Sequence, residues 1–348
     1  MSVEGIIKVF EAQGGAASRR QLKEAGYPRR SIEAMIRRRV LVAVRKDALV
    51  LGTALAGATP WARRALEARA VGLSLAPTVP PARAGTPSTP GSGQDAAGPA
   101  YALSHESSLM ILDLPYFGED GLIHLVRTDG RRGRRDGTIW VHRPQDPDWV
   151  VDVDGLRVIR PVLAALQVAA THGPEAGLVA LDGVLHQAQV RDLESTGRRD
   201  GPESAEARRQ VTAALALGWG PARPTVTLVV DLADGRSESA GESRTRWLLR
   251  TLGFGPMTPQ FPVQEGRDLV GRADLKLDRW AVLVEFDGTG KYDEDGALVA
   301  EKDREDRLRR LGYEVVRVRW ADLARPHLVR RRILGAIGRA EARAAAMA

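Results

Sequence analysis

A proline-rich stretch from Leu75 to Ala100 divides this chain of 348 residues. Its prolines stand at positions 77, 80, 81, 87, 90 and 99, and it holds hardly any large apolar side chain. Such a segment cannot bury enough surface to offset the entropy that it loses on ordering, so it predicts a linker and not part of a core. Its length therefore predicts a domain boundary.

The remaining sequence predicts an α/β protein with several domains. We expect a winged-helix domain with a trailing helix over residues 1–73, and a linker over 74–100. A mixed α/β domain is expected over 101–235 and a second α/β domain over 236–348. The apolar content of 43% and the charged content of 27% are typical of globular proteins, which excludes a wholly disordered or coiled-coil chain.

The chain has no cysteine, which excludes disulfides and thiolate metal ligands and is typical of a reducing cytoplasm. Any metal must therefore be bound by oxygen or histidine ligands. No apolar run approaches the roughly 18 residues that span a bilayer, and the first residues lack the basic start of a signal peptide. We expect a cytoplasmic protein without a membrane partner.

Residues 1–52 carry short helical patterns followed by an alternating segment. Ser18 and Gln21 have the spacing of a capping box, which predicts a helix that begins there. A further helix is predicted after Pro28, and residues 40–51 predict a hairpin. Helix, turn, helix and hairpin in this order are typical of a winged-helix domain.

The positive charge of the chain is concentrated in this first region. The whole sequence has 51 basic and 44 acidic residues, a net charge of +7, and residues 19–46 are far more basic than that average. A basic helix in a winged helix favours contact with DNA phosphates, while a merely solvated helix face is the alternative interpretation. The candidate DNA-binding residues are Arg19, Arg20, Arg29, Arg30, Arg37, Arg38, Arg39 and Lys46.

The middle segment gives weaker signals. The run Ser104–Ser107 resembles part of a hydrolytic constellation but lacks the glycines of a nucleophile elbow, so we interpret it as a helix start capped by Ser104. The other histidines of the middle segment show no paired-ligand spacing, and no zinc site is predicted from them. They are His124, His142, His172 and His186.

The sharpest signal lies in the C-terminal third. Residues 268–277 alternate between apolar and polar side chains, and residues 281–286 are nearly all apolar, which predicts a strand covered on both faces. In an antiparallel hairpin of these segments Asp274 lies near Glu285. Glu285 and Asp287 project from the same side because strands have a period of two.

Clustered acids disfavour one another's ionisation unless a cation neutralises them. Oxygen ligands suit Mg²⁺ or Mn²⁺, and such an ion could activate water and stabilise charge on a phosphate. Asp274, Glu285 and Asp287 are therefore the candidate metal ligands. The alternative is a buried acid that is paired with Arg272 or Lys302.

The residues of this region, in order, resemble the PD-(D/E)XK nuclease superfamily, and within it the branch related to very-short-patch repair endonucleases. The residues that carry the resemblance are Glu242, Asp274, Val284–Gly288, Lys291–Tyr292, Glu301–Leu308 and Arg319–Leu323. It implies a three-layer α/β/α fold of the restriction-endonuclease type.

The resemblance also implies the roles of individual residues. Asp274 and Glu285 would bind the metal with the main-chain carbonyl of Phe286, and Glu242 would support the metal or its waters. The pattern departs from the family where Asp287 stands in the place of its lysine. Lys291 or Lys302 would then supply the basic group that orients the attacking water.

The N-terminal part is similar to the winged helix of AbiEi-type antitoxins from type IV toxin-antitoxin systems. Together the two resemblances imply a DNA-binding protein with an Mg²⁺-dependent (or Mn²⁺-dependent) endonuclease domain that hydrolyses phosphodiester bonds. The alternative is a non-enzymatic antitoxin and transcriptional autorepressor with a degenerate nuclease fold. A cognate toxin and a second copy of the chain, forming a homodimer, are the further partners that this alternative implies.

Overall fold

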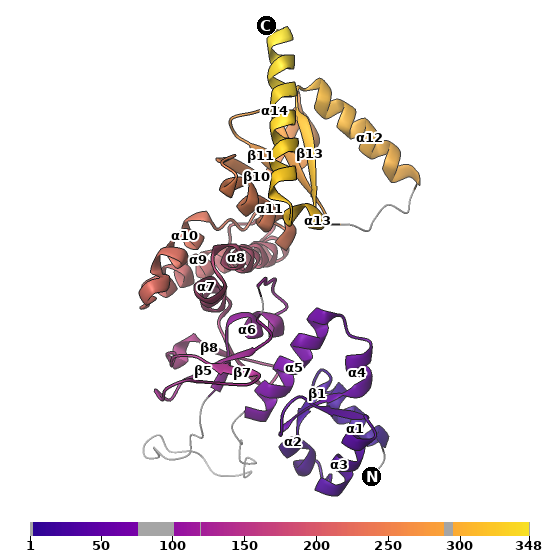
Figure 1. Cartoon of the computed structure of the whole chain (residues 1–348), viewed down its shortest axis with the longest axis vertical. Coiled ribbons are helices and arrows are strands. Elements are labelled where there is room, and N and C mark those ends of the chain that lie inside the picture. Colours follow the sequence, from indigo (N-terminus) through magenta and orange to yellow (C-terminus); the bar gives the residue numbers. More distant parts are fainter. Residues whose placement is uncertain (1–2, 76–100, 119, 289–294, 348) are drawn as a thin grey trace. The chain divides into compact units, whose positions relative to one another are not determined.

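The computed structural model describes residues 3–75, 101–118, 120–288 and 295–347, and the chain forms two compact units, Met1–Val168 and Ala169–Ala348 (Figure 1). The domain boundary expected between residues 235 and 236 lies inside the second unit. The boundary expected at the linker lies inside the first unit, where Val71 before the linker and Leu103 after it belong to one core. Most of the linker expected over 74–100 lies outside the described residues. The expected mixed α/β class is confirmed, since the described residues combine helices with both mixed and antiparallel sheets.

The first unit begins with a winged helix. Its elements are α1 (Val3–Glu11), β1 (Ala16–Ser18), α2 (Arg19–Glu24), α3 (Arg29–Arg37), β2 (Leu41–Ala43) and β3 (Ala48–Leu51). The strands pair antiparallel in the order β1-β3-β2. The predicted capping box is confirmed, because the Ser18 side chain accepts the N–H of Gln21 while the Gln21 side chain accepts the N–H of Ser18. Phe10, Leu22 and Ile32 form its core.

A sheet with the order β6-β7-β5-β4-β9-β8, together with several helices, forms the rest of this unit. The elements are α4 (Gly52–Ala56), α5 (Pro60–Leu75), β4 (Tyr101–Leu103), α6 (His105–Ile111), β5 (Ile123–Arg127), β6 (Arg134–Asp136), β7 (Ile139–Val141), η1 (Pro147–Trp149), β8 (Val150–Val153), β9 (Leu156–Ile159) and α7 (Pro161–His172), the last of which contains the boundary between the units. Helix α5 lies close to the sheet, since a Cβ atom at Gly72 would stand 2.7 Å from the Leu156 side chain. Larger residues there would push the helix off the sheet.

The second unit begins with a group of helices, two of which are joined by a buried ion pair. They are α8 (Pro174–Thr196), α9 (Pro202–Leu215), η2 (Gly220–Ala222), α10 (Arg223–Leu232) and α11 (Ala240–Thr251). Asp182 of α8 is fully buried and lies 2.6 Å from Arg246 of α11. Its carboxylate also accepts the hydroxyl of Ser243 and the N–H of Asp234, so each buried oxygen has a donor.

A four-stranded sheet with helices on both faces ends the chain. Its elements are β10 (Met257–Glu265), β11 (Asp268–Leu277), β12 (Val282–Asp287), α12 (Asp295–Arg310), β13 (Glu314–Arg319), α13 (Trp320–Leu323) and α14 (Pro326–Met347). The order is β10-β11-β12-β13, and only β12 and β13 are parallel, with α12 between them in sequence. Val284 packs with Ile333 of α14, and Leu283 on the opposite face packs with Leu308 of α12. The expected three-layer arrangement is therefore present.

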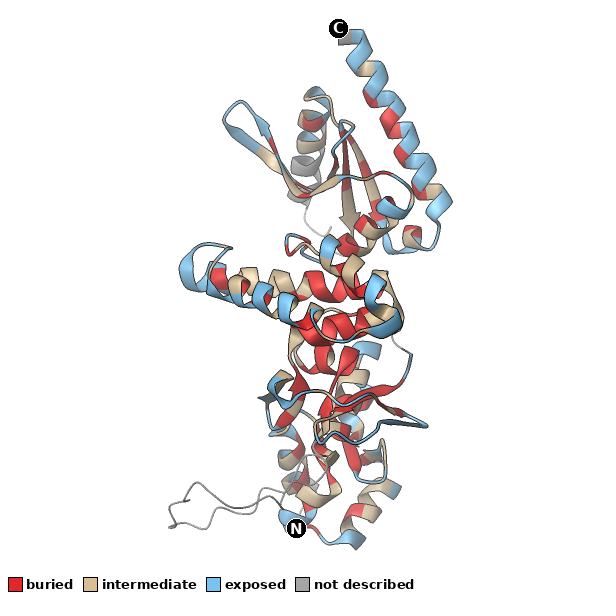
Figure 2. Cartoon of the chain, turned by 90° about the vertical axis from the view of Figure 1, so that its left-hand side faces the viewer, coloured by how far each residue is buried: buried red, intermediate tan, exposed pale blue. Residues whose placement is uncertain are grey.

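The alternation predicted for residues 268–277 holds only in the second half of β11. Ala273, Leu275 and Leu277 are buried, but Leu269 is 63% exposed. The tip of the β10–β11 hairpin is exposed on both strands (Figure 2). The prediction failed at Leu269 because a period of two shows which side chains share a face, not how far a neighbouring layer covers that face.

None of the helices in the described part of the chain is long and apolar enough to cross a membrane.

Candidate functional site

Three of the predicted acids line one open cavity of about 420 Å³ where β11 and β12 meet. They are Asp274, Glu285 and Asp287. Asp274 Oδ2 accepts the main-chain N–H of Phe286 at 2.7 Å, which joins the two strands just beyond their last ladder pair. The structure therefore brings together the residues that the sequence predicted to be neighbours.

The surroundings of Asp274 change its ionisation. Burial and the nearby carboxylates of Glu242 and Glu285 raise its pKa to about 7, although the Phe286 N–H acts in the opposite direction. Near neutral pH a substantial fraction of this carboxyl is therefore protonated. A cation beside it would favour the ionised form, so the electrostatics of the site suit a divalent ion.

Arginines face the other two acids. Arg304 Nη2 of α12 lies 2.6 Å from Glu285 Oε1, and Arg317 Nε lies 3.8 Å from Glu285 Oε2. Arg319 Nε lies 3.0 Å from Asp287 Oδ2. The parallel register of β12 and β13 accounts for the contacts of Arg317 and Arg319, because it sets Glu285 opposite Arg317 and Asp287 opposite Arg319. The sequence patterns did not predict these arginines as partners of the acids.

The side chains of the two predicted lysines lie outside the described part of the chain. Lys291 lies outside the described residues, and Lys302 belongs to α12 but its side chain is likewise outside the described part. Arg272, named above as an alternative partner of the acids, lies 2.8 Å from Glu238 instead. The basic groups that the structure places at this cavity are thus all arginines among the residues that it describes.

Glu242 is held at the start of α11. Its N–H donates to Ser239 Oγ at 3.2 Å, as in a capping box, but its carboxylate accepts the N–H of Glu238 at 3.0 Å and not that of the N-cap residue. The same carboxylate accepts the Ser239 hydroxyl and the Gln260 side-chain amide. Glu242 is not among the described residues that line the cavity, so it acts on Asp274 through its charge.

Asp274 and Glu285 suit a divalent ion in the type of their donor atoms. Among the described residues, however, no three acids of this cavity have oxygens within 4.8 Å of one another. An ion here would be held by these two carboxylates together with main-chain or water oxygens, as Mg²⁺ commonly is. Binding by Glu285 further requires that Arg304 give way.

The predicted DNA-binding residues differ in their surroundings. Arg19 lies 2.7 Å from Glu33 and contacts the Lys46 carbonyl, so it links α2 to α3 and to the hairpin. Arg20 lies 3.8 Å from Glu24 on its own helix. The other six side chains are exposed at the two ends of α3 and in the hairpin turn: Arg29, Arg30, Arg37, Arg38, Arg39 and Lys46.

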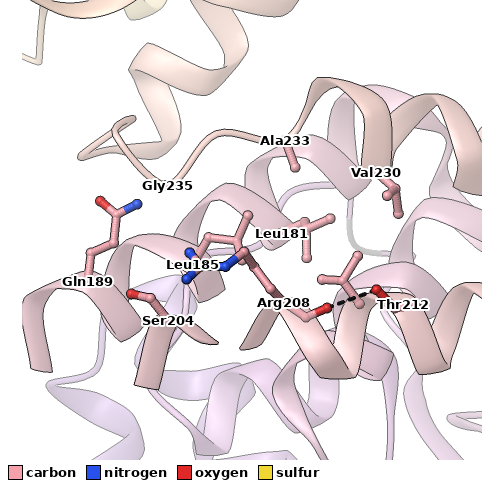
Figure 3. A pocket seen from close by; sticks show the side chains of 10 residues that line it. Leu181, Leu185, Gln189, Ser204, Arg208, Thr212, Val230, Ala233 and Gly235 are labelled. Carbon is pink, nitrogen blue, oxygen red and sulfur yellow. Dashed lines mark hydrogen bonds between the residues drawn. The ribbon is translucent and has the colours of Figure 1, made fainter. Parts of the chain in front are cut away.

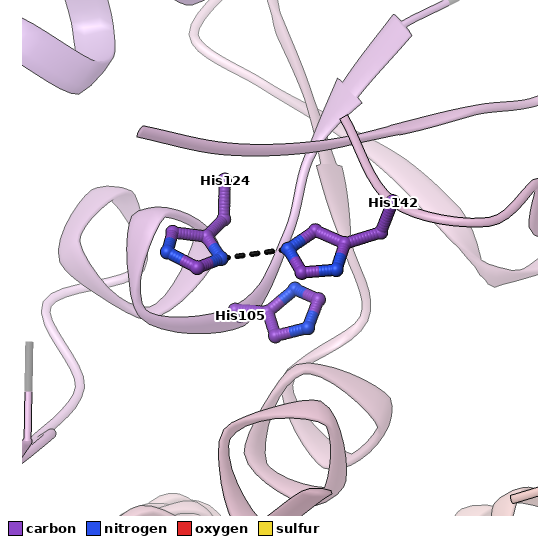
Figure 4. Close-up of side chains that lie close together, drawn as sticks. All are labelled: His105, His124 and His142. Atoms are coloured by element: carbon purple, nitrogen blue, oxygen red, sulfur yellow. Dashed lines mark hydrogen bonds between the residues drawn. The ribbon is translucent and has the colours of Figure 1, made fainter. Parts of the chain in front are cut away.

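Three histidines that the sequence did not connect lie together in the first unit. His105, His124 and His142 offer nitrogen atoms that all lie within 4.8 Å of one another (Figure 4). The interpretation of Ser104 as an N-cap is correct in position, since α6 begins at His105. The expected side-chain cap is absent, because the Ser104 hydroxyl lies 3.0 Å from His105 Nδ1 instead.

A second cavity, of about 360 Å³, lies among α8, α9 and α10 (Figure 3). Apolar side chains such as Leu181, Leu185 and Val230 line it, with Gln189 and Arg208 as polar neighbours. It contains none of the residues predicted from the sequence.

Comparisons with protein-family models, with curated proteins and with solved structures found no match. The fold and the sites alone define the class of this protein, which is a mixed α/β protein with a winged helix and a three-layer domain.

Proposed function

We propose that this chain is a cytoplasmic DNA-binding protein whose C-terminal domain hydrolyses DNA phosphodiester bonds with a divalent cation. The observation that carries the proposal is the meeting of Asp274 and Glu285 in one open, polar cavity that arginines also line. Carboxylates bind the cation, and guanidinium groups bind phosphate, so the cavity holds both kinds of group that this chemistry needs. The resemblance to PD-(D/E)XK nucleases supports the same function.

The residues of the cavity would have different roles in this reaction. Asp274 and Glu285, with the Phe286 carbonyl, would hold Mg²⁺ or Mn²⁺, which supplies an activated water and stabilises charge on the phosphate. Arg272 and Arg317 border the same space and would bind the phosphate oxygens. Asp287 is already fixed by Arg319, so we assign it to the support of the site.

The winged helix would hold the DNA. In such domains the second helix of the helix-turn-helix enters the major groove, which here is α3. The exposed arginines at its two ends, Arg29 and Arg30 at the start and Arg37 and Arg38 at the end, would contact phosphates and base edges. Arg19 would fix the angle of this helix through Glu33 and would not touch DNA.

One observation favours a second function, that of a non-enzymatic antitoxin and autorepressor. Both oxygens of Glu285 face arginines, so its charge is compensated without a metal. The lysine position of the nuclease pattern is also occupied by Asp287. A protein of this kind would bind an inverted repeat as a homodimer through the winged helix, and would oppose a cognate toxin without cutting DNA.

Plasmid cleavage separates the two functions. Purified wild-type protein is incubated with Mg²⁺ or Mn²⁺ beside Glu285→Ala and beside Glu265→Ala, which removes an acid paired with Arg307 outside the cavity. We expect cutting by the wild type and by Glu265→Ala, and none by Glu285→Ala. Equal cutting by all three would indicate a contaminating nuclease. DNA binding without cutting by any of them would favour the antitoxin.

A further inference from the structure

The histidine cluster is assembled by three separate segments of the first unit. His105 begins α6, His124 lies in β5, and His142 directly follows β7. Strands β5 and β7 are parallel neighbours whose register places His124 beside Trp140, and His142, two residues after Trp140, follows on the same face. His124 is fully buried and His105 is 4% exposed. The cluster is thus part of the interior and not a chance gathering of surface side chains.

Each ring nitrogen of His124 has its own type of neighbour. Nδ1 lies 2.7 Å from His142 Nε2, and Nε2 lies 3.0 Å from both Asp120 Oδ1 and Glu106 Oε1. In the neutral ring, Nε2–H donates to the carboxylates, which leaves the lone pair of Nδ1 directed at His142. Histidines that bind metals commonly have this arrangement, in which a carboxylate accepts the outer N–H and thereby fixes the tautomer and the ring orientation.

The fold holds His105 in an unusual backbone conformation. Its φ angle is +52°, in the left-handed region that few residues other than glycine adopt. The main-chain N–H of His105 donates to the buried Gln167 side chain, and its ring stacks on that of His142 with centroids 3.8 Å apart. Strained residues persist where the surroundings impose them, and they concentrate at ligand sites.

We propose that His105, His124 and His142 bind one divalent transition-metal ion with the coordination preferences of Zn²⁺. Imidazole nitrogens are ligands for zinc and its neighbours in the periodic table, whereas Mg²⁺ prefers oxygen. This site is therefore chemically distinct from the acid cavity of the other unit. The negative charge of Asp120 and Glu106 behind His124 stabilises a cation on the opposite side of that ring.

Binding requires small changes in the cluster. The metal takes the place of the proton between His124 Nδ1 and His142 Nε2, and that proton moves to His142 Nδ1, so the ring stays neutral. The two nitrogens separate from 2.7 Å to about 3.3 Å, as two ligands of a tetrahedral zinc ion do. The His105 ring turns out of its stack on His142 so that its lone pair meets the metal.

Metal binding by the full chain tests this proposal. Untagged protein is stripped with EDTA and titrated with Zn²⁺ by calorimetry, and with Co²⁺ by visible absorption, which reports on nitrogen coordination. We expect one ion per chain and a thermal unfolding midpoint that rises with Zn²⁺ concentration, because the ion binds the folded state. His142→Asn should weaken Zn²⁺ binding by more than about tenfold.

Two control variants locate the site. His327→Asn removes an exposed histidine, and His186→Asn removes a histidine of α8 that lies 3.1 Å from the Gly235 carbonyl; both should bind Zn²⁺ like the wild type. The absence of Zn²⁺ and Co²⁺ binding by the wild type would overturn the proposal, which does not depend on any variant folding. Unchanged binding by a folded His142→Asn protein would also overturn it, because the ion would then lie elsewhere.

Discussion

Arg304 Nη2 and Glu285 Oε1 lie 2.6 Å apart, so α12 is joined to the end of β12 by an ion pair at the acid cavity. The two side chains are 23% and 14% exposed, so water and salt screen this pair only in part. The arginine occupies one carboxylate oxygen of Glu285, which the proposed function assigns to the metal ion. Arg304 thus competes with a cation for Glu285.

Replacing this arginine should therefore strengthen metal binding. We expect Arg304→Ala to bind Mn²⁺ about two- to fivefold more tightly than the wild type, which corresponds to a partly screened ion pair of about 0.5–1 kcal/mol. Electron paramagnetic resonance measures the free Mn²⁺. Arg309→Ala is the matched control, because Arg309 lies on the same helix and pairs with Glu305. Equal affinities for all three proteins would show that Glu285 is not a ligand.

Asp274→Asn should stabilise the protein at alkaline pH in the presence of EDTA. The pKa of Asp274 is about 7 in the folded chain and near 3.8 when unfolded, so the folded state holds more protons between these values. The free energy of unfolding of the wild type therefore falls as pH rises through this window, whereas that of Asp274→Asn does not fall for this reason. We expect a gain of about 1–3 kcal/mol near pH 8 and little gain near pH 4. Unfolding midpoints at the two pH values measure it, and a variant less stable than the wild type near pH 8 would contradict this account.

Glu314 stabilises the contact between β13 and α14. Its carboxylate lies 2.7 Å from Arg339 and 2.6 Å from Arg343. Although burial acts in the opposite direction, these arginines lower the pKa of Glu314 below its usual 4.5. The ionised carboxylate therefore contributes its full stabilisation above pH 4.5, and this stabilisation is lost as pH falls through the lowered pKa. We expect Glu314→Gln to lower the free energy of unfolding by about 1–3 kcal/mol near pH 7 and by less in acid.

Urea unfolding at both pH values tests the role of Glu314. Glu341→Gln, an exposed acid on α14, is the control and should change stability little. A cost for Glu314→Gln that stays constant down to strong acid would exclude the charge of this carboxylate as the cause.

The double variant Arg37→Ala and Arg38→Ala should weaken DNA binding about tenfold or more at moderate salt. It should also make the slope of log affinity against log salt concentration shallower, by the release of about two fewer counterions. Fluorescence anisotropy over a range of salt concentrations, without divalent ions, measures both effects. Arg330→Ala with Arg331→Ala removes the same charge from exposed positions on α14. If both double variants lose affinity equally, net charge and not the winged helix governs binding.

Local patterns predicted the parts of the fold that depend on near neighbours in sequence. The capping box at Ser18 and Gln21 and the closeness of Asp274 to Glu285 both follow from contacts across a helix start or a short hairpin. Strand β1 was missed because its three buried residues are too few to alternate. Helix α14 was also missed, although its buried side chains recur at helical spacing from Val329 to Ala340.

Parts of the sites depend on contacts that no local pattern reveals. Arg317 meets Glu285 only because β13 pairs in parallel with β12, a register that the intervening helix conceals. Likewise helix α6 separates His105 from His124, and strands β6 and β7 separate His124 from His142, so no helical or hairpin spacing links the three histidines. The left-handed backbone at His105 is set by its surroundings and has no signature in the sequence.

The parallel pairing of β12 and β13 also orders events during synthesis. Glu285 and Asp287 leave the ribosome roughly thirty residues before Arg317 and Arg319, and parallel strands can pair only after the crossover helix has formed. Until then, the arginines of β13 are not available to the acids of β12. The centre of the second unit is therefore completed only when β13 has emerged, so a product terminated before β13 would carry the winged helix without a finished acid cavity.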